Sequence, residues 1–118
     1  MGIEKFEDIR VWNKAQELTI TIYSEVNNIK DYCFKDQLTK AAISISNNIA
    51  EGFERKSNPD FARFLNYALG STGEVRSMLY LAKNLNYLDE SKTNELILKT
   101  QQISGMITRL KQSLFKKK

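Results

Sequence analysis

Between Gln37 and Gly52 the chain reads Gln-Leu-Thr-Lys-Ala-Ala-Ile-Ser-Ile-Ser-Asn-Asn-Ile-Ala-Glu-Gly. Apolar residues recur in this stretch at steps of three and four, at Leu38, Ala42, Ile45 and Ile49. Such spacing places them on one face of an α-helix, and strand signals such as Asn-Gly or Asp-Gly turns are missing from the chain. The pattern predicts an amphipathic helix over about residues 35–55, whose alanines and serines let another helix approach closely.

The same period continues on both sides of this helix. Three further helices are predicted, over about residues 8–30, 59–86 and 89–115. The apolar stripe of the first consists of Val11, Ala15, Leu18, Ile22, Val26 and Ile29, with Trp12 and Tyr23 widening it. The stripe of the third consists of Phe61, Leu65, Ala68, Thr72, Val75, Leu79 and Ala82, and that of the fourth of Leu96, Ile103, Ile107, Leu110 and Leu114.

Local signals mark where two of these helices begin. Ser57 can cap the third helix, Pro59 suits its first turn, and Asp60 is an acid favourable to the helix dipole. Asp89 can cap the fourth helix in the same way. Because the connections are short, neighbouring helices must run antiparallel. We therefore expect an all-α protein with a single domain over residues 1–118, an antiparallel up-down-up-down four-helix bundle with a short basic C-terminal tail.

Composition restricts the classes of function. The 118 residues are 42% apolar and 27% charged, as in globular proteins, and they include one cysteine and no histidine. Without histidine the commonest general base and metal ligand are missing, so we expect no enzyme activity, no catalytic residues, no cofactor and no metal. The lone Cys33 and the shortness of the apolar runs predict a cytoplasmic protein that does not cross a membrane.

The net charge of +4 is unevenly distributed. Residues 1–90 carry 11 basic and 13 acidic side chains, whereas residues 91–118 carry 7 basic and 1 acidic. Five of the positive charges fall within ten residues, at Arg109, Lys111, Lys116, Lys117 and Lys118. Such clusters commonly bind phosphate backbones or other anionic surfaces. A solvated, solubilising tail is an equally good interpretation of this feature by itself.

Two glycines interrupt the third helix. Gly70 and Gly73 each cost roughly 1 kcal/mol there relative to alanine. We expect another helix, of this chain or of a second subunit, to approach the backbone at this point; contact with a ligand is the alternative. The glycines are not a phosphate-binding loop, because they lie within a helical pattern and lack the terminal Gly-Lys-Ser/Thr.

Polar and aromatic side chains give weaker signals. Asn47, Asn48, Glu51 and Glu54 form a polar ridge beside the core face of the second helix, and Glu74 could face it from the third. We expect ion pairs with Lys40, Arg55 or Arg63 rather than a cation site or proton exchange. The aromatic residues Tyr32, Phe34, Phe53 and Tyr67 could stack on bases, but aromatics at helical spacing more often belong to a core.

Three blocks of sequence are specific enough to suggest a family. They are Phe6-Glu-Asp-Ile-Arg-Val-Trp-Asn-Lys-Ala15, the stretch from Gln37 to Gly52, and Phe64-Leu followed by Ala68-Leu-Gly-Ser71 and Glu74. This pattern, over roughly residues 6–88, resembles the four-helix-bundle proteins encoded by intervening sequences within bacterial 23S ribosomal RNA genes. It is also similar to the accessory protein of diversity-generating retroelements, a basic pentamer associated with nucleic acid and a reverse transcriptase.

The resemblance implies a four-helix bundle that assembles as a ring, typically a homopentamer. The family motif falls on Asn48, Glu51, Gly52, Arg55, Gly70, Ser71 and Glu74, for which a structural role is expected. The chain departs from the family pattern at Lys40, where arginine is usual, and at Ser46, where proline is common. Losing the planar guanidinium at position 40 weakens any bidentate phosphate contact there.

The leading functional hypothesis is a non-enzymatic homo-oligomer that binds nucleic acid, with structured ribosomal RNA as the expected ligand. The residues expected to bind it are Arg109, Lys111, Lys116, Lys117 and Lys118, with Lys40 and Arg55. The alternative is an oligomeric scaffold that binds a protein partner and has no nucleic-acid role.

Overall fold

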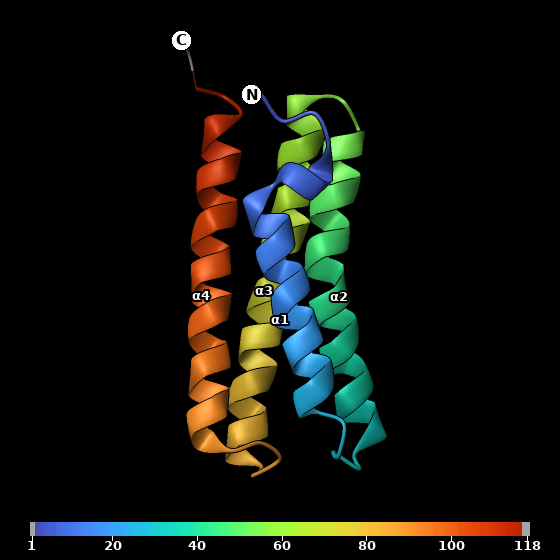
Figure 1. Ribbon diagram of the computed structural model, residues 1–118, viewed down its shortest axis with the longest axis vertical. Helices are drawn as coiled ribbons and strands as arrows, with labels where there is room; N and C mark the ends of the chain where they lie inside the picture. Colours follow the sequence, from blue (N-terminus) through green and yellow to red (C-terminus); the bar gives the residue numbers. More distant parts are fainter. Residues whose placement is uncertain (1, 117–118) are drawn as a thin grey trace.

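The computed structural model describes residues 2–116 and contains four long helices (Figure 1). They are α1 (Arg10–Glu25), α2 (Tyr32–Glu54), α3 (Asn58–Asn84) and α4 (Glu90–Ser113), and a short 3₁₀ helix, η1 (Phe6–Asp8), precedes α1. Successive helices run in opposite directions along a bundle measuring 49 × 21 × 19 Å. The predicted all-α four-helix fold is confirmed.

The apolar stripes meet in a single core. Every stripe residue predicted in α1 through α3 is buried, including Val26 and Ile29 just beyond α1, and in α4 only Leu110 is half-buried. Buried threonine hydroxyls are satisfied locally: Thr72 donates to the Ala68 carbonyl at 2.7 Å and Thr100 to the Ile97 carbonyl at 2.6 Å. Periodicity was sufficient to predict this core because each stripe faces the other three helices.

The first helix is shorter than predicted. Ile9 is extended (φ −77°, ψ 116°), so α1 begins at Arg10 and not at residue 8. The Asn13 amide donates to the Glu7 and Ile9 carbonyls, at 3.0 and 3.2 Å, which holds η1 against the start of α1. The helix ends at Glu25, before two asparagines of low helix propensity.

The two aromatic residues expected to widen the α1 stripe behave differently. Tyr23 is 49% exposed, so the prediction was wrong for it, because its position faces outward beside α2. Trp12 does pack against the core, with the Phe6 ring 5.2 Å away.

Capping residues define the other helix ends. Asp31 accepts a hydrogen bond from the Phe34 amide at 3.1 Å, so α2 begins three residues before the predicted start. Ser57 and Asp89 cap α3 and α4 as predicted, accepting from the amides of Asp60 (3.2 Å) and Lys92 (3.0 Å). Asn86, just beyond α3, has φ 59°, a conformation that asparagine tolerates at a helix C-terminus.

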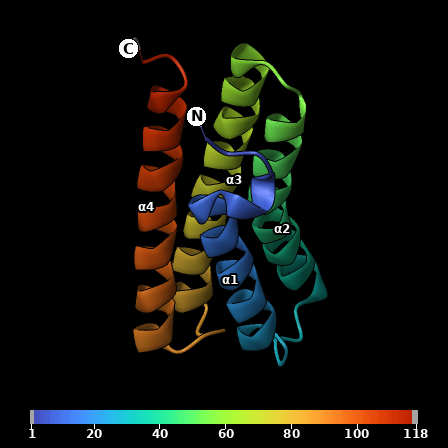
Figure 2. The same cartoon turned by 45° about the horizontal axis from the view of Figure 1, so that its top comes forward.

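The bundle has two distinct ends. The N-terminal segment, the α2–α3 turn and the end of α4 lie together at one end, as Figures 1 and 2 show. The α1–α2 and α3–α4 turns lie at the other, where the Tyr87 hydroxyl donates to the Asp31 carboxylate at 2.8 Å. None of the helices within residues 2–116 is long and apolar enough to cross a membrane.

Candidate functional site

Several residues of the family motif come together along the seam between α2 and α3. Ser44 accepts two hydrogen bonds at its hydroxyl, from the Asn48 amide and from the Ser71 hydroxyl across the seam, both at 2.9 Å. The Asn48 amide also donates to the Ser44 carbonyl at 2.8 Å. Two motif residues of separate helices, Asn48 and Ser71, therefore share one acceptor that fixes the register of α2 against α3.

Gly52 marks a close approach of the two helices. A Cβ placed on Gly52 would lie 2.6 Å from the Phe64 Cβ and 3.1 Å from a ring carbon of Phe61. Real Cβ atoms do not approach so closely, so only glycine fits here without moving a helix. The predicted close approach of another helix to the small face of α2 is found at this residue.

Gly70 has no such contact. Within the described residues, a Cβ added at Gly70 or at Gly73 would meet nothing within 4 Å, and Gly70 is exposed. The expectation that another helix of this chain packs there was wrong, because the glycines face outward from α3. An approach by a second subunit or a ligand is left as the alternative.

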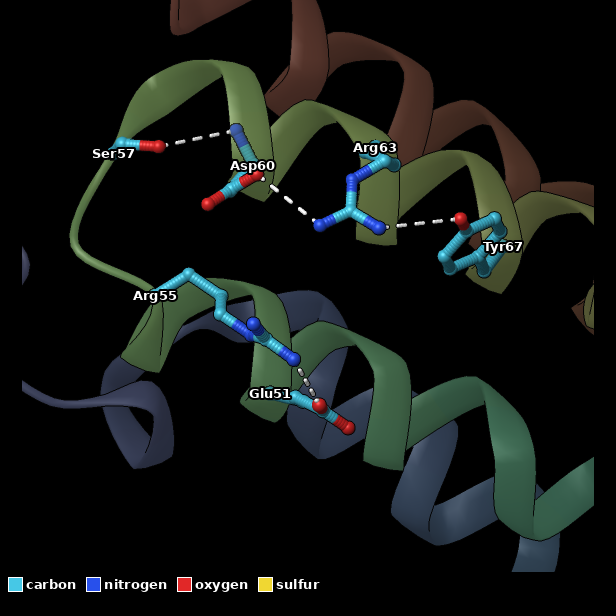
Figure 3. Close-up of polar contacts among 6 residues, drawn as sticks. All are labelled: Glu51, Arg55, Ser57, Asp60, Arg63 and Tyr67. Atoms are coloured by element: carbon cyan, nitrogen blue, oxygen red, sulfur yellow. Dashed lines mark hydrogen bonds and ion pairs between the residues drawn. The ribbon is translucent and has the colours of Figure 1, made fainter.

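Next to Gly52, two arginines enclose the ring of Phe64. The guanidinium carbons of Arg55 and Arg63 each lie 4.9 Å from the ring centroid, and the Phe64 side chain is almost fully covered. Arg55 donates to Glu51 at 2.8 Å, while Arg63 donates to Asp60 at 3.2 Å and to the Tyr67 hydroxyl at 3.4 Å (Figure 3). The arginines are thus held by ring contact and hydrogen bonds together.

The surroundings of Arg63 favour its charged form. Its hydrogen bond to the Tyr67 hydroxyl, and then that to Asp60, raise the pKa of this guanidinium above its ordinary value. Its salt bridge is largely solvent-exposed, so the ionic attraction itself contributes little stability. The constellation offers a fixed positive surface beside an exposed phenol ring.

The predicted ion pairs are found in part. Arg55 does pair with Glu51 of the polar ridge. Lys40 instead pairs with Asp36 at 3.0 Å, and Arg63 with Asp60, because each has a carboxylate three or four residues earlier on its own helix. Among the described residues Glu54 and Glu74 have no ion pair. No group of three potential metal ligands occurs within residues 2–116.

Some of the predicted nucleic-acid-binding residues lie at one end of the bundle. The Asn58 amide donates to the Leu114 carbonyl at 2.8 Å, which joins the α2–α3 turn, with Arg55, to the end of α4. The Lys111 ammonium donates to the Asn66 side chain at 2.8 Å, along the α3–α4 side. Lys116 is exposed beyond α4, and Lys117 and Lys118 lie outside the described residues.

Two predicted residues are elsewhere. Lys40 precedes Arg55 by fifteen residues on α2 and its turn, about 22 Å at 1.5 Å per residue. Arg109 lies over Gly105, with a guanidinium nitrogen 3.3 Å from where a Cβ would be, and lines the α1–α4 side of the bundle. Neither joins the group around Arg55.

Sequence reasoning missed two cations at the same end, Lys56 and Arg63. Lys56 has φ 65° in the α2–α3 turn, with its ammonium 5.5 Å from the Phe53 ring. Both residues flank the recognisable cap at Ser57, which could have indicated their position. Of the four candidate stacking aromatics, Phe34 is buried and Phe53 half-buried, as expected, but Tyr32 and Tyr67 are exposed.

The fold and seam define a small four-helix bundle whose most specific residues lock α2 to α3. The family model described as 23S rRNA-intervening sequence protein matches residues 7–109, and the chain belongs to that family. The match confirms the resemblance seen in the three blocks and extends it into α4.

A solved structure supports the same fold. A crystal structure of a protein of unknown function from the S23 ribosomal protein family of Bacteroides thetaiotaomicron gives a TM-score of 0.80. The two chains are 24% identical, and the match covers 86% of this chain and 97% of that one. At this identity the likeness shows the fold alone. A search of curated proteins gave no significant match.

Proposed function

We propose that this protein is a non-enzymatic homo-oligomeric bundle that binds structured RNA through the basic end formed by the α2–α3 turn and the end of α4. The observation that carries the proposal is the Asn58–Leu114 hydrogen bond, which brings the cations of the α2–α3 turn beside those of α4. The family's description as a 23S rRNA-intervening sequence protein agrees with an RNA ligand. Contacts to phosphates would dominate, without selecting a base sequence.

The charges of this end support a phosphate ligand. Its cations among residues 51–63 and 111–116 are Arg55, Lys56, Arg63, Lys111 and Lys116, and its carboxylates are Glu51, Glu54 and Asp60. Lys56, Lys111 and Lys116 form no ion pair with a described carboxylate, so their charges are free to meet phosphates. The N-terminal segment at this end carries Glu4, Glu7 and Asp8 against Lys5 and Arg10, so its side chains add no net positive charge to that of α2, α3 and α4.

A salt titration tests the proposal. Replacing Lys56, Lys111 and Lys116 by glutamine should weaken binding of a labelled RNA hairpin and lower the magnitude of the log-log salt slope by roughly 2 to 3 units, at about 0.7 to 0.9 per phosphate contact. The matched control replaces Lys30, Lys35 and Lys83 away from this end and should leave the slope unchanged. Wild type and triple variant with the same affinity and slope would refute the proposal.

The outward glycines of α3 support assembly. Within the described chain no atom lies within 4 Å of where a Gly70 Cβ would be, so close packing does not offset the helix cost of this glycine, whereas a neighbouring subunit packed on its bare backbone would. A pentamer would weigh five times the 13.6 kDa chain, about 68 kDa. Gly70→Leu should lower the mass measured by light scattering while helicity is kept. A purely monomeric wild type at micromolar concentration would contradict this part of the proposal.

A protein-binding scaffold is the second candidate function. It is favoured by an open groove between α1 and α4, on the side of the bundle opposite the α2–α3 seam. In that case the protein would show no RNA affinity to be lost with salt.

A further inference from the structure

The α1–α4 side of the bundle is open. A groove of about 740 Å³ runs between the two helices. In the described chain no side-chain hydrogen bond or ion pair joins α1 to α4, whereas α1 is tied to α2 by bonds from Gln16 to Ser46 (2.9 Å) and from Thr19 to the Ala42 carbonyl (3.1 Å). Among the described residues, polar side chains therefore do not bridge α1 and α4 across the groove, as they do between α1 and α2.

The floor of the groove is apolar. Val11, Leu18 and Ile103 form its base and are buried in the core, while Ile3, Met106 and Leu110 are only partly covered. None of the residues that line the groove is aromatic. The partly covered Ile3, Met106 and Leu110 thus offer aliphatic surface, beside the polar Gln101 and Gln102, but the described part of the groove has no ring on which a nucleic-acid base could stack.

The walls of the groove are basic on both sides. Arg10 and Lys14 rise from α1, and Lys99 and Arg109 from α4, while Glu17 is the one carboxylate among the lining residues. Glu17 pairs with Lys14 at 3.7 Å; Arg10, Lys99 and Arg109 have no carboxylate within ion-pair distance in the described chain. Arg109 folds back over the side-chain-free surface of Gly105, which keeps its charge along the groove.

We propose that this groove docks an amphipathic helix of a partner protein, with an aliphatic stripe flanked on both sides by carboxylates. The aliphatic floor between two cationic walls is complementary to such a helix, in which the stripe recurs every three or four residues. An RNA strand would contact the cations but would place no aliphatic group against the floor. The proposal concerns a different face from the basic end and does not depend on RNA binding.

A peptide probe tests the proposal. The probe is a fluorescein-labelled 18-residue peptide with leucine at i, i+3, i+4 and i+7 positions and glutamate on both flanks. Two reference peptides have the same composition with the period broken, or lysine in place of glutamate. Fluorescence anisotropy should show the wild-type protein binding the first peptide at least tenfold more tightly than either reference. Equal binding of all three, or no binding, would overturn the proposal.

Charge reversal locates the site. The double variant Arg10→Glu, Lys99→Glu should lower the affinity for the acidic peptide at least tenfold and make the lysine peptide the preferred ligand. The control, Lys30→Glu with Lys83→Glu, changes net charge equally outside the groove and should stay within threefold of wild type. A control that loses as much affinity as the groove variant would show attraction to overall charge only, and would overturn the site.

Met106→Lys separates a seated helix from simple attraction. It adds a positive charge, which would strengthen a purely electrostatic complex. It also removes aliphatic surface from the floor, so it should lower the affinity for the acidic peptide at least fivefold. Retained helicity and melting temperature, measured for each variant by circular dichroism, exclude unfolding as the cause. Displacement of subunits by the peptide, seen as a fall in mass by light scattering, would assign the groove to a second copy of this chain and overturn the proposal. The proposal would also be overturned if an RNA oligonucleotide displaced the peptide and if the Arg10→Glu, Lys99→Glu variant bound that oligonucleotide more weakly than wild type.

Discussion

The two seams on opposite sides of this bundle are built differently. Along α2–α3 a glycine lies against the Phe64 Cβ position, a serine bonds to a serine across the seam, and two arginines cover one ring. Along α1–α4 a groove remains, lined by cations with few partners. The residues of the family motif concentrate on the closed seam, so a highly specific sequence pattern here reports helix packing. The open seam carries none of these seven residues, although Arg10, Val11 and Lys14 of the Phe6–Ala15 block line it, and it has the surface available for a partner.

The largest effect is expected at the closed seam. Gly52→Ala should destabilise the bundle by roughly 1–3 kcal/mol, because its Cβ would overlap that of Phe64 and one helix must shift. Urea unfolding monitored by circular dichroism measures the change. An unchanged unfolding midpoint would show that α2 and α3 can separate freely and that the two seams do not differ in tightness.

The polar bond across the same seam should have a smaller effect. Ser71→Ala leaves Ser44 without its cross-seam partner and should cost about 1 kcal/mol. Ser77→Ala, on an exposed position of α3, is the matched control and should be nearly neutral. If both alanine variants have the same free energy of unfolding as wild type, the hydrogen bond between Ser71 and Ser44 does not contribute to the stability of the seam.

The open seam should respond in the opposite direction. Gly105→Ala should stabilise the protein by up to about 1 kcal/mol, since the new Cβ meets only the flexible end of Arg109 and alanine is the better helix former. The same urea titration used for Gly52→Ala gives the comparison directly. Destabilisation comparable to that of Gly52→Ala would mean that α4 is as tightly constrained as α2.

The smallest effect is a dependence on pH at the far end of the closed side. Hydrogen bonds from the Phe34 amide and then the Tyr87 hydroxyl hold the pKa of Asp31 below its ordinary value of 3.8. The unfolded chain therefore takes up this proton first, and the stabilisation present above pH 3.8 is lost as pH falls through the lower folded value. Asp31→Asn should narrow the stability difference between pH 6 and pH 2.5. An identical pH dependence in both proteins would remove Asp31 from the acid response.

Much of the fold could be predicted because its signals are periodic or local. The stripe positions repeat at helical spacing, and the caps at Ser57 and Asp89 act within three residues. The cap at Asp31 was missed because a charged, aromatic-rich stretch follows it and the helical period becomes visible only later. The late start of α1, at Arg10, depends on the η1 turn that Asn13 holds by its side chain, a contact that periodicity does not contain.

The site was harder to predict because helix geometry divides what the sequence presents as one cluster. Arg109 and Lys111 are two residues apart, so they project about 200° apart around α4. One lines the groove beside α1, and the other bonds to Asn66 of α3. The basic tail is thus not one surface, and only the three-dimensional arrangement shows that Lys56 and Arg63 belong with Lys111.

The placement of the described ends at Gly2 and Lys116 affects how the protein can be labelled. The N-terminal segment before η1 and the end of α4 both lie at the same end of the bundle as the α2–α3 turn (Figure 1). An affinity tag or fluorescent protein fused to either terminus would crowd the surface assigned to RNA and could mask it in a binding assay. A reporter inserted in the α1–α2 turn, near Asn28, would instead lie at the opposite end of a molecule 49 Å long, leaving both the basic end and the upper part of the groove accessible.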